Sequence, residues 1–172
     1  MNKILITLLL FLLSSCSTIN NKSFDIKPKG ELLAYLQITN PTYYNKEGYY
    51  FYKENRKDQN PTLYVYEYRN GTMVSMHATE FFNDINSIGL EPFDYEKEIE
   101  LAKEKSDFEW ITLDGYELEI MINTNQGKFL IKTSNPGADL RECAKYSENL
   151  QKLVKVIKHL QLYYGESVIN IL

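Results

Sequence analysis

The alternation of apolar and polar residues along the chain predicts several β-strands. Residues 62–77 (TLYVYEYRNGTMVSMH) contain two β-prone runs on either side of Asn70-Gly71, a dipeptide that favours a two-residue hairpin turn. Residues 49–53 form a dense aromatic run that also favours a strand. Residues 108–133 contain three further β-prone runs, separated by turn signals at Asp114-Gly115 and Gln126-Gly127. These segments predict an antiparallel sheet built from hairpins.

Two short segments of this first part of the chain are expected to be helical. Residues 31–38 (ELLAYLQI) predict a short helix that ends before Pro41, because the residue before a proline disfavours helical backbone angles. Residues 79–88 predict a second helix, which ends at Gly89.

Two later segments give stronger helical patterns. Residues 93–105 predict a helix with Asp94 as its N-cap. After Pro136-Gly137, residues 138–163 predict a long amphipathic helix. Its apolar stripe consists of Leu140, Cys143, Leu150, Leu153, Val154, Ile157 and Leu160. Taken together, the elements predict an α+β fold, in which helices pack on one face of the antiparallel sheet and a long helix lies at the C-terminal end.

The Asn70-Gly71 turn should fix the register of the predicted hairpin. Uniform antiparallel pairing then places Tyr66 opposite Ser75 and Tyr64 opposite His77. One face of the hairpin is expected to carry Tyr64, Tyr66, Tyr68, Met73, Ser75 and His77. The other face is expected to carry Leu63, Val65, Glu67, Val74 and Met76.

The tyrosine side of this hairpin is the part of the chain that points to a molecular function. The chain has 14 Tyr and 1 Trp, and tyrosine combines a large contact area with a polar tip, as interfaces require. The candidate binding face therefore consists of Tyr64, Tyr66, Tyr68, Met73 and His77. The alternative is that a helix covers this side and the tyrosines belong to the core.

The side chains of residues 110–122 divide between the two faces of the predicted strands. The face expected to join the core carries Ile111, Leu113, Tyr116, Leu118, Ile120 and Ile122. The opposite face carries Trp110, Thr112, Glu117 and Glu119, and two acids beside a tryptophan resemble half of a glycosidase site. Acids two residues apart on a strand more often keep a surface soluble, so a hydrolase is only a minor alternative.

No established catalytic or metal-binding motif is present, which favours a non-enzymatic domain without a cofactor. The patterns H-E-x-x-H, C-x-x-C, G-x-S-x-G and the phosphate-binding loop are all absent from the sequence. Apart from Cys16, the nitrogen or sulfur ligands are limited to His77, His159 and Cys143, too few for a predicted zinc site. The acids of residues 94–100 alternate with lysine and predict a solvated helix face rather than a calcium site.

The charge of the chain argues against a nucleic-acid partner. Its formal net charge is −4, and lysines and acids are interspersed along the chain. Nucleic-acid binding requires clustered Lys and Arg to neutralise phosphates.

The beginning of the chain has the pattern of a signal peptide. Lys3 precedes an apolar stretch over residues 4–13, which is too short to cross a bilayer as a helix. The stretch ends in Leu13-Ser14-Ser15-Cys16, which resembles the lipobox of bacterial lipoproteins. The resemblance implies cleavage before Cys16 and a lipid attached to the Cys16 sulfur, so that the membrane is a partner. It also implies that Cys143 has no disulfide partner within the chain.

The same resemblance implies a location and a domain division. Ser17, rather than Asp, follows Cys16, which in a Gram-negative host implies the outer membrane facing the periplasm. Residues 1–15 are then the signal peptide, residues 16–30 the lipid anchor and a flexible tether, and residues 31–172 a single α+β domain. The order of elements in that domain is similar to PsbP-like envelope and lumenal domains.

These observations predict a lipid-anchored cell-envelope protein whose small α+β domain binds another macromolecule, most simply an envelope protein. One alternative is a protective lipoprotein of the immunity or exclusion type. Another is a module that binds a small ligand or glycan through the tyrosine-rich face.

Overall fold

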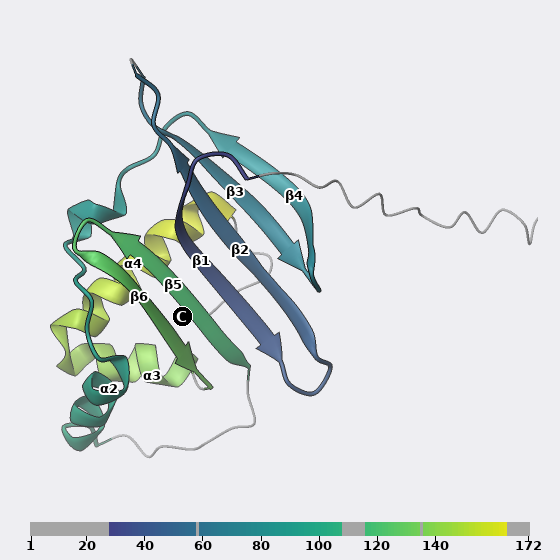
Figure 1. The fold of residues 1–172 in the computed structure, drawn as a ribbon. Coiled ribbons are helices and arrows are strands. Elements are labelled where there is room, and N and C mark those ends of the chain that lie inside the picture. Colours follow the sequence, from purple (N-terminus) through teal and green to yellow (C-terminus); the bar gives the residue numbers. More distant parts are fainter. Residues whose placement is uncertain (1–27, 58, 108–115, 135, 165–172) are drawn as a thin grey trace, which may run out of the picture.

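The computed structural model of the chain describes residues 28–57, 59–107, 116–134 and 136–164. These residues form an antiparallel sheet with helices on one face, which confirms the predicted α+β class (Figure 1). The strands are β1 (Glu31–Asn40), β2 (Asn45–Glu54), β3 (Thr62–Arg69), β4 (Thr72–Thr79), β5 (Glu117–Thr124) and β6 (Gly127–Thr133). The helices are η1 (Ile85–Ile88), α2 (Tyr95–Glu104), α3 (Pro136–Cys143), η2 (Ala144–Tyr146) and α4 (Glu148–Tyr164).

The sheet has the strand order β4-β3-β2-β1-β5-β6. Strands β1 to β4 form a meander, and each pairs with the next in antiparallel fashion. The β5-β6 hairpin then pairs with the other edge of β1, so β1 is an interior strand although it comes first in the chain. The sheet is therefore completed by a pairing between segments far apart in the sequence.

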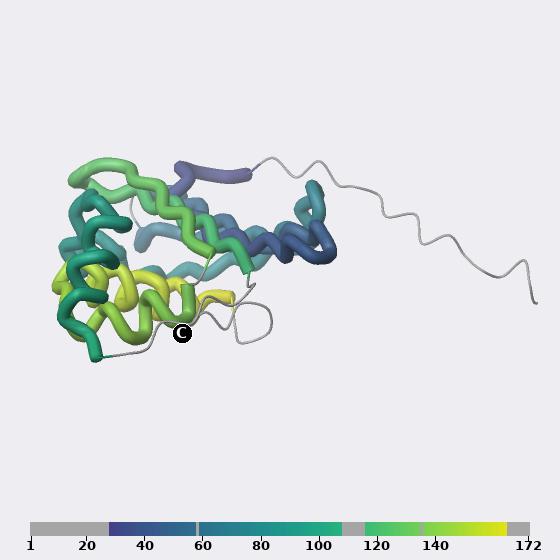
Figure 2. The backbone as a smooth tube through the Cα atoms, turned by 90° about the horizontal axis from the view of Figure 1, so that it is seen from below, coloured from purple at the N-terminus to yellow at the C-terminus, as the bar shows by residue number. Residues whose placement is uncertain are grey.

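The helices lie together on one side of the sheet, as Figure 2 shows along the edge of the layers. Leu36, Phe51 and Ile120 point from the sheet into the core and are almost fully buried. From the helical layer, Leu153 and Ile157 of α4 complete the core. Burial of these side chains is the main contribution to the stability of the sheet-helix sandwich.

The helix predicted over residues 31–38 is wrong, because this segment is strand β1. Leu33, Ala34, Leu36 and Gln37 are all buried, which gives the near-continuous apolar run of an interior strand instead of a clean alternation. A register shift between Leu32 and Ala34 against β2 adds to the irregular pattern. The run therefore resembles a short buried helix in sequence.

The helix predicted over residues 79–88 is also wrong for most of its length. Thr79 is the last residue of β4, and only the four residues of η1 are helical. Asp84 caps η1 by accepting a hydrogen bond from the backbone nitrogen of Asn86, and Gly89 ends it with a φ of 66°. The predicted end at Gly89 is thus confirmed.

The helix predicted after Phe93 is confirmed as α2, and Asp94 caps it as expected by accepting a hydrogen bond from the backbone nitrogen of Lys97. The single long helix predicted over residues 138–163 is instead divided into α3, η2 and α4. The division occurs at Ser147, whose backbone is extended and whose hydroxyl accepts a hydrogen bond from the backbone nitrogen of Leu150 at 3.2 Å. Ser147 also donates to Glu98 of α2 at 2.6 Å, so the break joins two helices.

The apolar stripe predicted for this helical region holds across the break. Leu140, Cys143, Leu150, Leu153, Ile157 and Leu160 are buried, and Val154 is half-buried. Cys143 is a free thiol with no exposed surface, and burial raises its pKa to about 11. The predicted place of Cys143 on the buried apolar stripe is confirmed, and there it packs as a small hydrophobic residue.

The hairpin turn at Asn70-Gly71 is confirmed, since both residues have positive φ angles, 46° and 91°. The predicted uniform register is wrong beyond the first two pairs, because a bulge shifts β4 by one residue between Tyr68 and Glu67. Tyr66 lies opposite Met76, not Ser75, and Tyr64 lies opposite Ala78, not His77. His77 lies opposite Val65 and therefore on the helix-covered side of the sheet.

The β5-β6 turn lies where the sequence predicted it, with Thr124 paired to Gly127. Leu118, Ile120 and Ile122 are buried in the core as expected, whereas Tyr116 is exposed. The remaining residues of the predicted strand before β5, together with the Asp114-Gly115 turn, lie outside the described residues.

Gly48 provides a test of the register between β1, β2 and β3. It lies in the middle of β2 between Gln37 and Tyr68, and a Cβ atom there would collide with the backbone carbonyl oxygen of Leu36. We therefore expect Gly48→Ala to lower the free energy of unfolding by roughly 1–3 kcal/mol, as overpacking does. Urea denaturation measures the change.

The matched control for this prediction is Asn45→Ala, at the exposed start of the same strand. It should change the free energy of unfolding by less than about 0.5 kcal/mol. Equal stability of the two variants would show that β1 and β2 do not approach each other as described.

Candidate binding surface

The sheet face opposite the helices carries six tyrosines, which we call the tyrosine face. They are Tyr35, Tyr50, Tyr52, Tyr64, Tyr66 and Tyr68. Strand pairing places Tyr35, Tyr50 and Tyr66 in one row, because Tyr35 pairs with Tyr50 and Tyr50 with Tyr66. Figure 2 shows that the described helices all lie on the other side of the sheet.

Ring contacts join five of the six tyrosines into two groups. The rings of Tyr35 and Tyr50 stack with centroids 5.2 Å apart, and Tyr50 contacts Tyr68 at 5.6 Å. Tyr52 and Tyr66 meet edge to face at 5.3 Å. These are favoured arrangements for aromatic pairs, and they hold the rings in fixed positions.

Burial differs across the tyrosine face. Tyr66 has no exposed surface and Tyr64 is 5% exposed, whereas the other four are half-buried. Lys29, near the start of the described chain, crosses this end of the face. Its backbone nitrogen donates to the Tyr66 hydroxyl at 2.9 Å, and its ammonium lies 5.6 Å from the centre of the Tyr64 ring. The face therefore has a buried part and an accessible part.

The hydroxyl groups near β1 and β5 are held by polar partners. Gln37, which is buried, donates to the Tyr50 hydroxyl at 3.3 Å. Tyr35 donates to Glu119 at 2.5 Å, and Lys132 forms an ion pair with the other oxygen of Glu119 at 2.9 Å. The tyrosine tips are thus part of an ordered polar arrangement at this end of the face.

This arrangement bears on the predicted hydrolase alternative. Hydrogen bonds from Lys132 and Tyr35 hold the pKa of Glu119 below its ordinary value. Burial and the bond to Glu119 raise the pKa of Tyr35. A general acid of a glycosidase requires a raised carboxyl pKa, so Glu119 is poorly suited to that role. Trp110, the third member of the suggested half-site, lies outside the described residues.

The other end of the tyrosine face has a similar charged rim. The Tyr64 hydroxyl donates to Glu54 at 3.1 Å and accepts a hydrogen bond from Arg56 at 3.3 Å. Arg56 and Glu54 also form an ion pair at 3.3 Å. Aromatic rings are therefore bounded at both ends by paired charges.

Four of the five residues predicted as the candidate binding face lie on it. Tyr64, Tyr66 and Tyr68 lie in β3, and Met73 of β4 lies opposite Tyr68. His77 does not belong to the face, because the β4 bulge turns it to the opposite side. No described helix covers these tyrosines (Figure 2), but Tyr64 and Tyr66 are buried, so the predicted alternative of core tyrosines holds for these two residues.

Sequence reasoning missed Tyr35, Tyr50 and Tyr52. The tyrosine-rich composition of β2 was visible, but assigning these residues to a face requires the pairing of β2 with β3. Tyr35 was missed because its segment was predicted to be helical.

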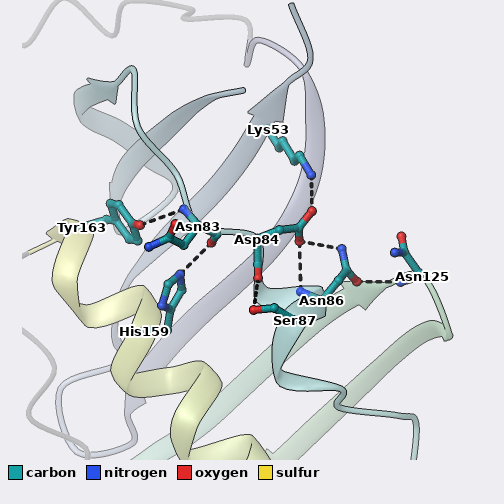
Figure 3. Close-up of polar contacts among 8 residues, drawn as sticks. All are labelled: Lys53, Asn83, Asp84, Asn86, Ser87, Asn125, His159 and Tyr163. Atoms are coloured by element: carbon teal, nitrogen blue, oxygen red, sulfur yellow. Dashed lines mark hydrogen bonds and ion pairs between the residues drawn. The ribbon is translucent and has the colours of Figure 1, made fainter. Parts of the chain in front are cut away.

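A second polar cluster, centred on Asp84, connects the loop after β4 with three other elements (Figure 3). Asp84 accepts hydrogen bonds from Lys53 of β2 at 2.5 Å and from the backbone nitrogen of Asn86 at 3.0 Å. Asn86 in turn accepts from the backbone nitrogen of Asn125 at 2.8 Å. The Asp84 cluster thus fixes the loop against β2 and the β5-β6 turn.

The same loop is also attached to α4 (Figure 3). A ring nitrogen of His159 lies 2.8 Å from the carbonyl oxygen of Asn83, and the Tyr163 hydroxyl accepts from the backbone nitrogen of Asn83 at 3.4 Å. The histidine therefore has a structural role. Burial alone would raise the pKa of Asp84, but the hydrogen bonds from Lys53 and Asn86 outweigh it and lower the pKa.

A small polar cavity of about 170 Å³ lies beside the Asp84 cluster. Lys53, Asn86, Asn123 and Asn125 contribute to its lining. Three of these contribute to hydrogen bonds within the protein, since Asn123 donates to Glu31 at 3.2 Å while Lys53 and Asn86 are occupied by Asp84. Ligand pockets usually enclose about 300–1,000 Å³, so this cavity fits a structural cluster better than a ligand site.

Within residues 28–57, 59–107, 116–134 and 136–164, no group of three or more His, Cys, Asp or Glu side chains is placed to hold a metal ion. None of the helices described in these ranges is long and apolar enough to cross a membrane.

Tyr66 tests the buried part of the tyrosine face. Truncation by Tyr66→Ala should lower the free energy of unfolding by about 3 kcal/mol or more, because it removes a fully buried ring. Tyr66→Phe removes only the hydroxyl that accepts from Lys29 and should cost about 1 kcal/mol. Urea melts of both variants measure these changes.

Tyr43→Ala is the matched control, because Tyr43 is 72% exposed in the turn between β1 and β2. It should change stability by less than about 0.5 kcal/mol. If Tyr66→Ala were as mild as Tyr43→Ala, the tyrosine face would be open along its whole length.

Comparisons with protein-family models, with curated proteins and with solved structures found no match to this chain. The resemblances to bacterial lipoproteins and to PsbP-like domains therefore stay predictions from the sequence. The structure itself shows an α+β domain with helices on one sheet face and a tyrosine-rich surface on the other.

Proposed function

We propose that this chain is a lipid-anchored cell-envelope protein that binds a protein partner through the accessible part of its tyrosine face. The observation that carries the proposal is a sheet face with six tyrosines on the side away from the described helices. A sheet usually buries such a surface under a second layer. Here a partner protein supplies that layer.

The anchor is inferred from the lipobox-like residues that end at Cys16. Each buried methylene of a lipid contributes about 0.8 kcal/mol to membrane binding, and stable attachment requires two or more chains. A lipidated N-terminal cysteine meets that requirement without a spanning helix. In a Gram-negative host, Ser17 after the cysteine favours the outer membrane facing the periplasm.

The tyrosine face has the chemistry of a protein interface. The half-buried rings of Tyr35, Tyr50 and Tyr68 are already held by contacts with each other, so binding would restrict them little further. Paired charges around Glu54 and Glu119 form a polar rim. An aromatic centre with a polar rim is the usual arrangement of binding energy in such interfaces.

A protective lipoprotein of the immunity or exclusion type would use the same surface, since it also acts by binding a protein. A small-ligand or glycan module is the second candidate, and one observation favours it. A cavity of about 250 Å³, slightly below the usual range of ligand pockets, has Thr39, Glu119 and Lys132 in its lining. The polar groups of its lining would suit a single sugar ring.

Anchoring is tested by Cys16→Ala. This change should abolish incorporation of labelled palmitate and leave the uncleaved precursor, because the processing enzyme of lipoproteins acts on the lipidated cysteine. Gel mobility and label incorporation in growing cells measure both effects, and Cys143→Ala serves as the control that keeps the label. Palmitate on the Cys16→Ala chain would exclude the proposed anchor.

Partner binding is tested by Tyr68→Ala, which removes a half-buried ring of the tyrosine face. Affinity capture from crosslinked intact envelopes should recover at least about tenfold less of the partner, since an interface tyrosine contributes about 2 kcal/mol. Tyr43→Ala, which removes an exposed tyrosine away from the face, should leave capture unchanged.

Equal capture by the wild-type chain and a stably folded Tyr68→Ala variant would contradict a protein partner on this face. A thermal shift with monosaccharides, in the absence of any captured protein, would instead support the second candidate.

A further inference from the structure

Strand β4 forms one edge of the sheet and is unusually open to further pairing. It pairs with β3 on one side, and among the described residues no strand lies on its other side. Its sequence, TMVSMHAT, contains no Lys, Arg, Asp, Glu or Pro. Natural edge strands usually carry such residues, because unpaired backbone groups otherwise pair with a strand of another chain.

The exposed apolar side chains of β4 add to this openness. Val74 is 50% exposed and Met76 is 41% exposed. Met76 lies opposite Tyr66, at the end of the row that contains Tyr50 and Tyr35. A strand added beside β4 would continue this apolar row and cover Met76.

The opposite edge of the sheet, β6, shows the usual protection. Lys128 and Lys132 lie on either side of Leu130, and both are exposed. Antiparallel self-pairing about Leu130 would place Lys128 of one copy opposite Lys132 of the other. Like charges directly opposite each other destabilise a strand pair. The two edge strands therefore differ: β4 can pair with the same strand of a second copy of the chain, whereas like charges disfavour such pairing at β6.

The bulge in β4 limits, but does not prevent, pairing at its free edge. Bulges are one way of protecting an edge, and this one lies at Val74, next to the turn. Residues 75–79 continue beyond it in regular register with β3. These five residues equal the length of an ordinary strand.

We propose that two copies of this chain associate through β4, with residues 75–79 of each copy paired antiparallel about His77. Such a contact is a two-fold, isologous interface, in which every residue meets the partner's copy of the same segment. In this register His77 lies opposite its own copy, Met76 opposite Ala78 and Ser75 opposite Thr79, so no Lys, Arg, Asp or Glu side chains face each other across the pair. The interface joins two sheets into one.

The geometry also agrees with two lipid anchors in one membrane. The two-fold axis of an antiparallel strand pair is perpendicular to the sheet, so both tyrosine faces point the same way. Lys29, close to the beginning of the described chain, lies on that face in each copy. This agreement rests on the proposed anchor, whereas the pairing of β4 does not.

The experiment uses the full chain, purified in detergent with two distinguishable tags, and follows association by light scattering and by capture through one tag. The wild-type chain should form dimers. Met76→Lys and Met76→Glu should each weaken association by about tenfold, because the two copies of position 76 are diagonal neighbours on one face of the strand pair, within reach of long side chains of like charge. An equal mixture of the two variants should restore association as mixed pairs.

Leu130→Lys is the matched control, because Leu130 is 51% exposed on the other edge strand. It should leave association unchanged. A monomeric wild-type chain at high concentration, or equal weakening by Leu130→Lys, would overturn the proposal. So would a mixture of Met76→Lys and Met76→Glu chains that stays monomeric, and circular dichroism of each variant verifies that it is folded.

Discussion

The whole structure depends on one constraint: a six-stranded sheet has two faces, and its described helices cover only one of them. On the covered face, aliphatic side chains such as Leu36 and Ile120 pack against α4. On the other face, the side chains must shield the sheet themselves. Tyrosine suits this position, because neighbouring rings exclude water from the strands while each hydroxyl can still find a polar partner. The six tyrosines of this face are thus explained by the layer arrangement of the fold.

The sequence predicted the parts of the fold that depend on local chemistry. Asn70-Gly71 requires a particular turn, and Asp94 has the side chain of an N-cap, so both were placed correctly. The apolar stripe from Leu140 to Leu160 was also predicted correctly, because burial on one side gives apolar residues the same spacing whether they lie in one helix or in two. The break at Ser147 could not be predicted from the apolar spacing, because that spacing is the same with or without a break. The break depends on the side-chain hydrogen bonds of Ser147, one with the backbone nitrogen of Leu150 and one with Glu98.

The parts that failed depend on tertiary contacts. Residues 31–38 are apolar on both sides because β1 is enclosed by β2 and β5, and no local pattern reveals such neighbours. The same limitation applied to the candidate site. Three of its six tyrosines were assigned from one hairpin, but His77 was misplaced by a single bulged residue, and Tyr35 was hidden in a segment taken for a helix. Successive side chains of a strand point to opposite faces of the sheet. One extra residue therefore moves every later side chain of that strand to the other face.

The pairing of β1 with β5 has a consequence for the kinetics of folding. Tyr35 and Glu119, which are in contact across this pair, are 84 residues apart in the chain. The meander from β1 to β4 can form from neighbouring segments, but the interior edge of β1 stays open until β5 arrives. Domains dominated by non-local strand pairing fold in milliseconds to seconds, because the entropy of loop closure is lost before the stabilising contacts between the strands form.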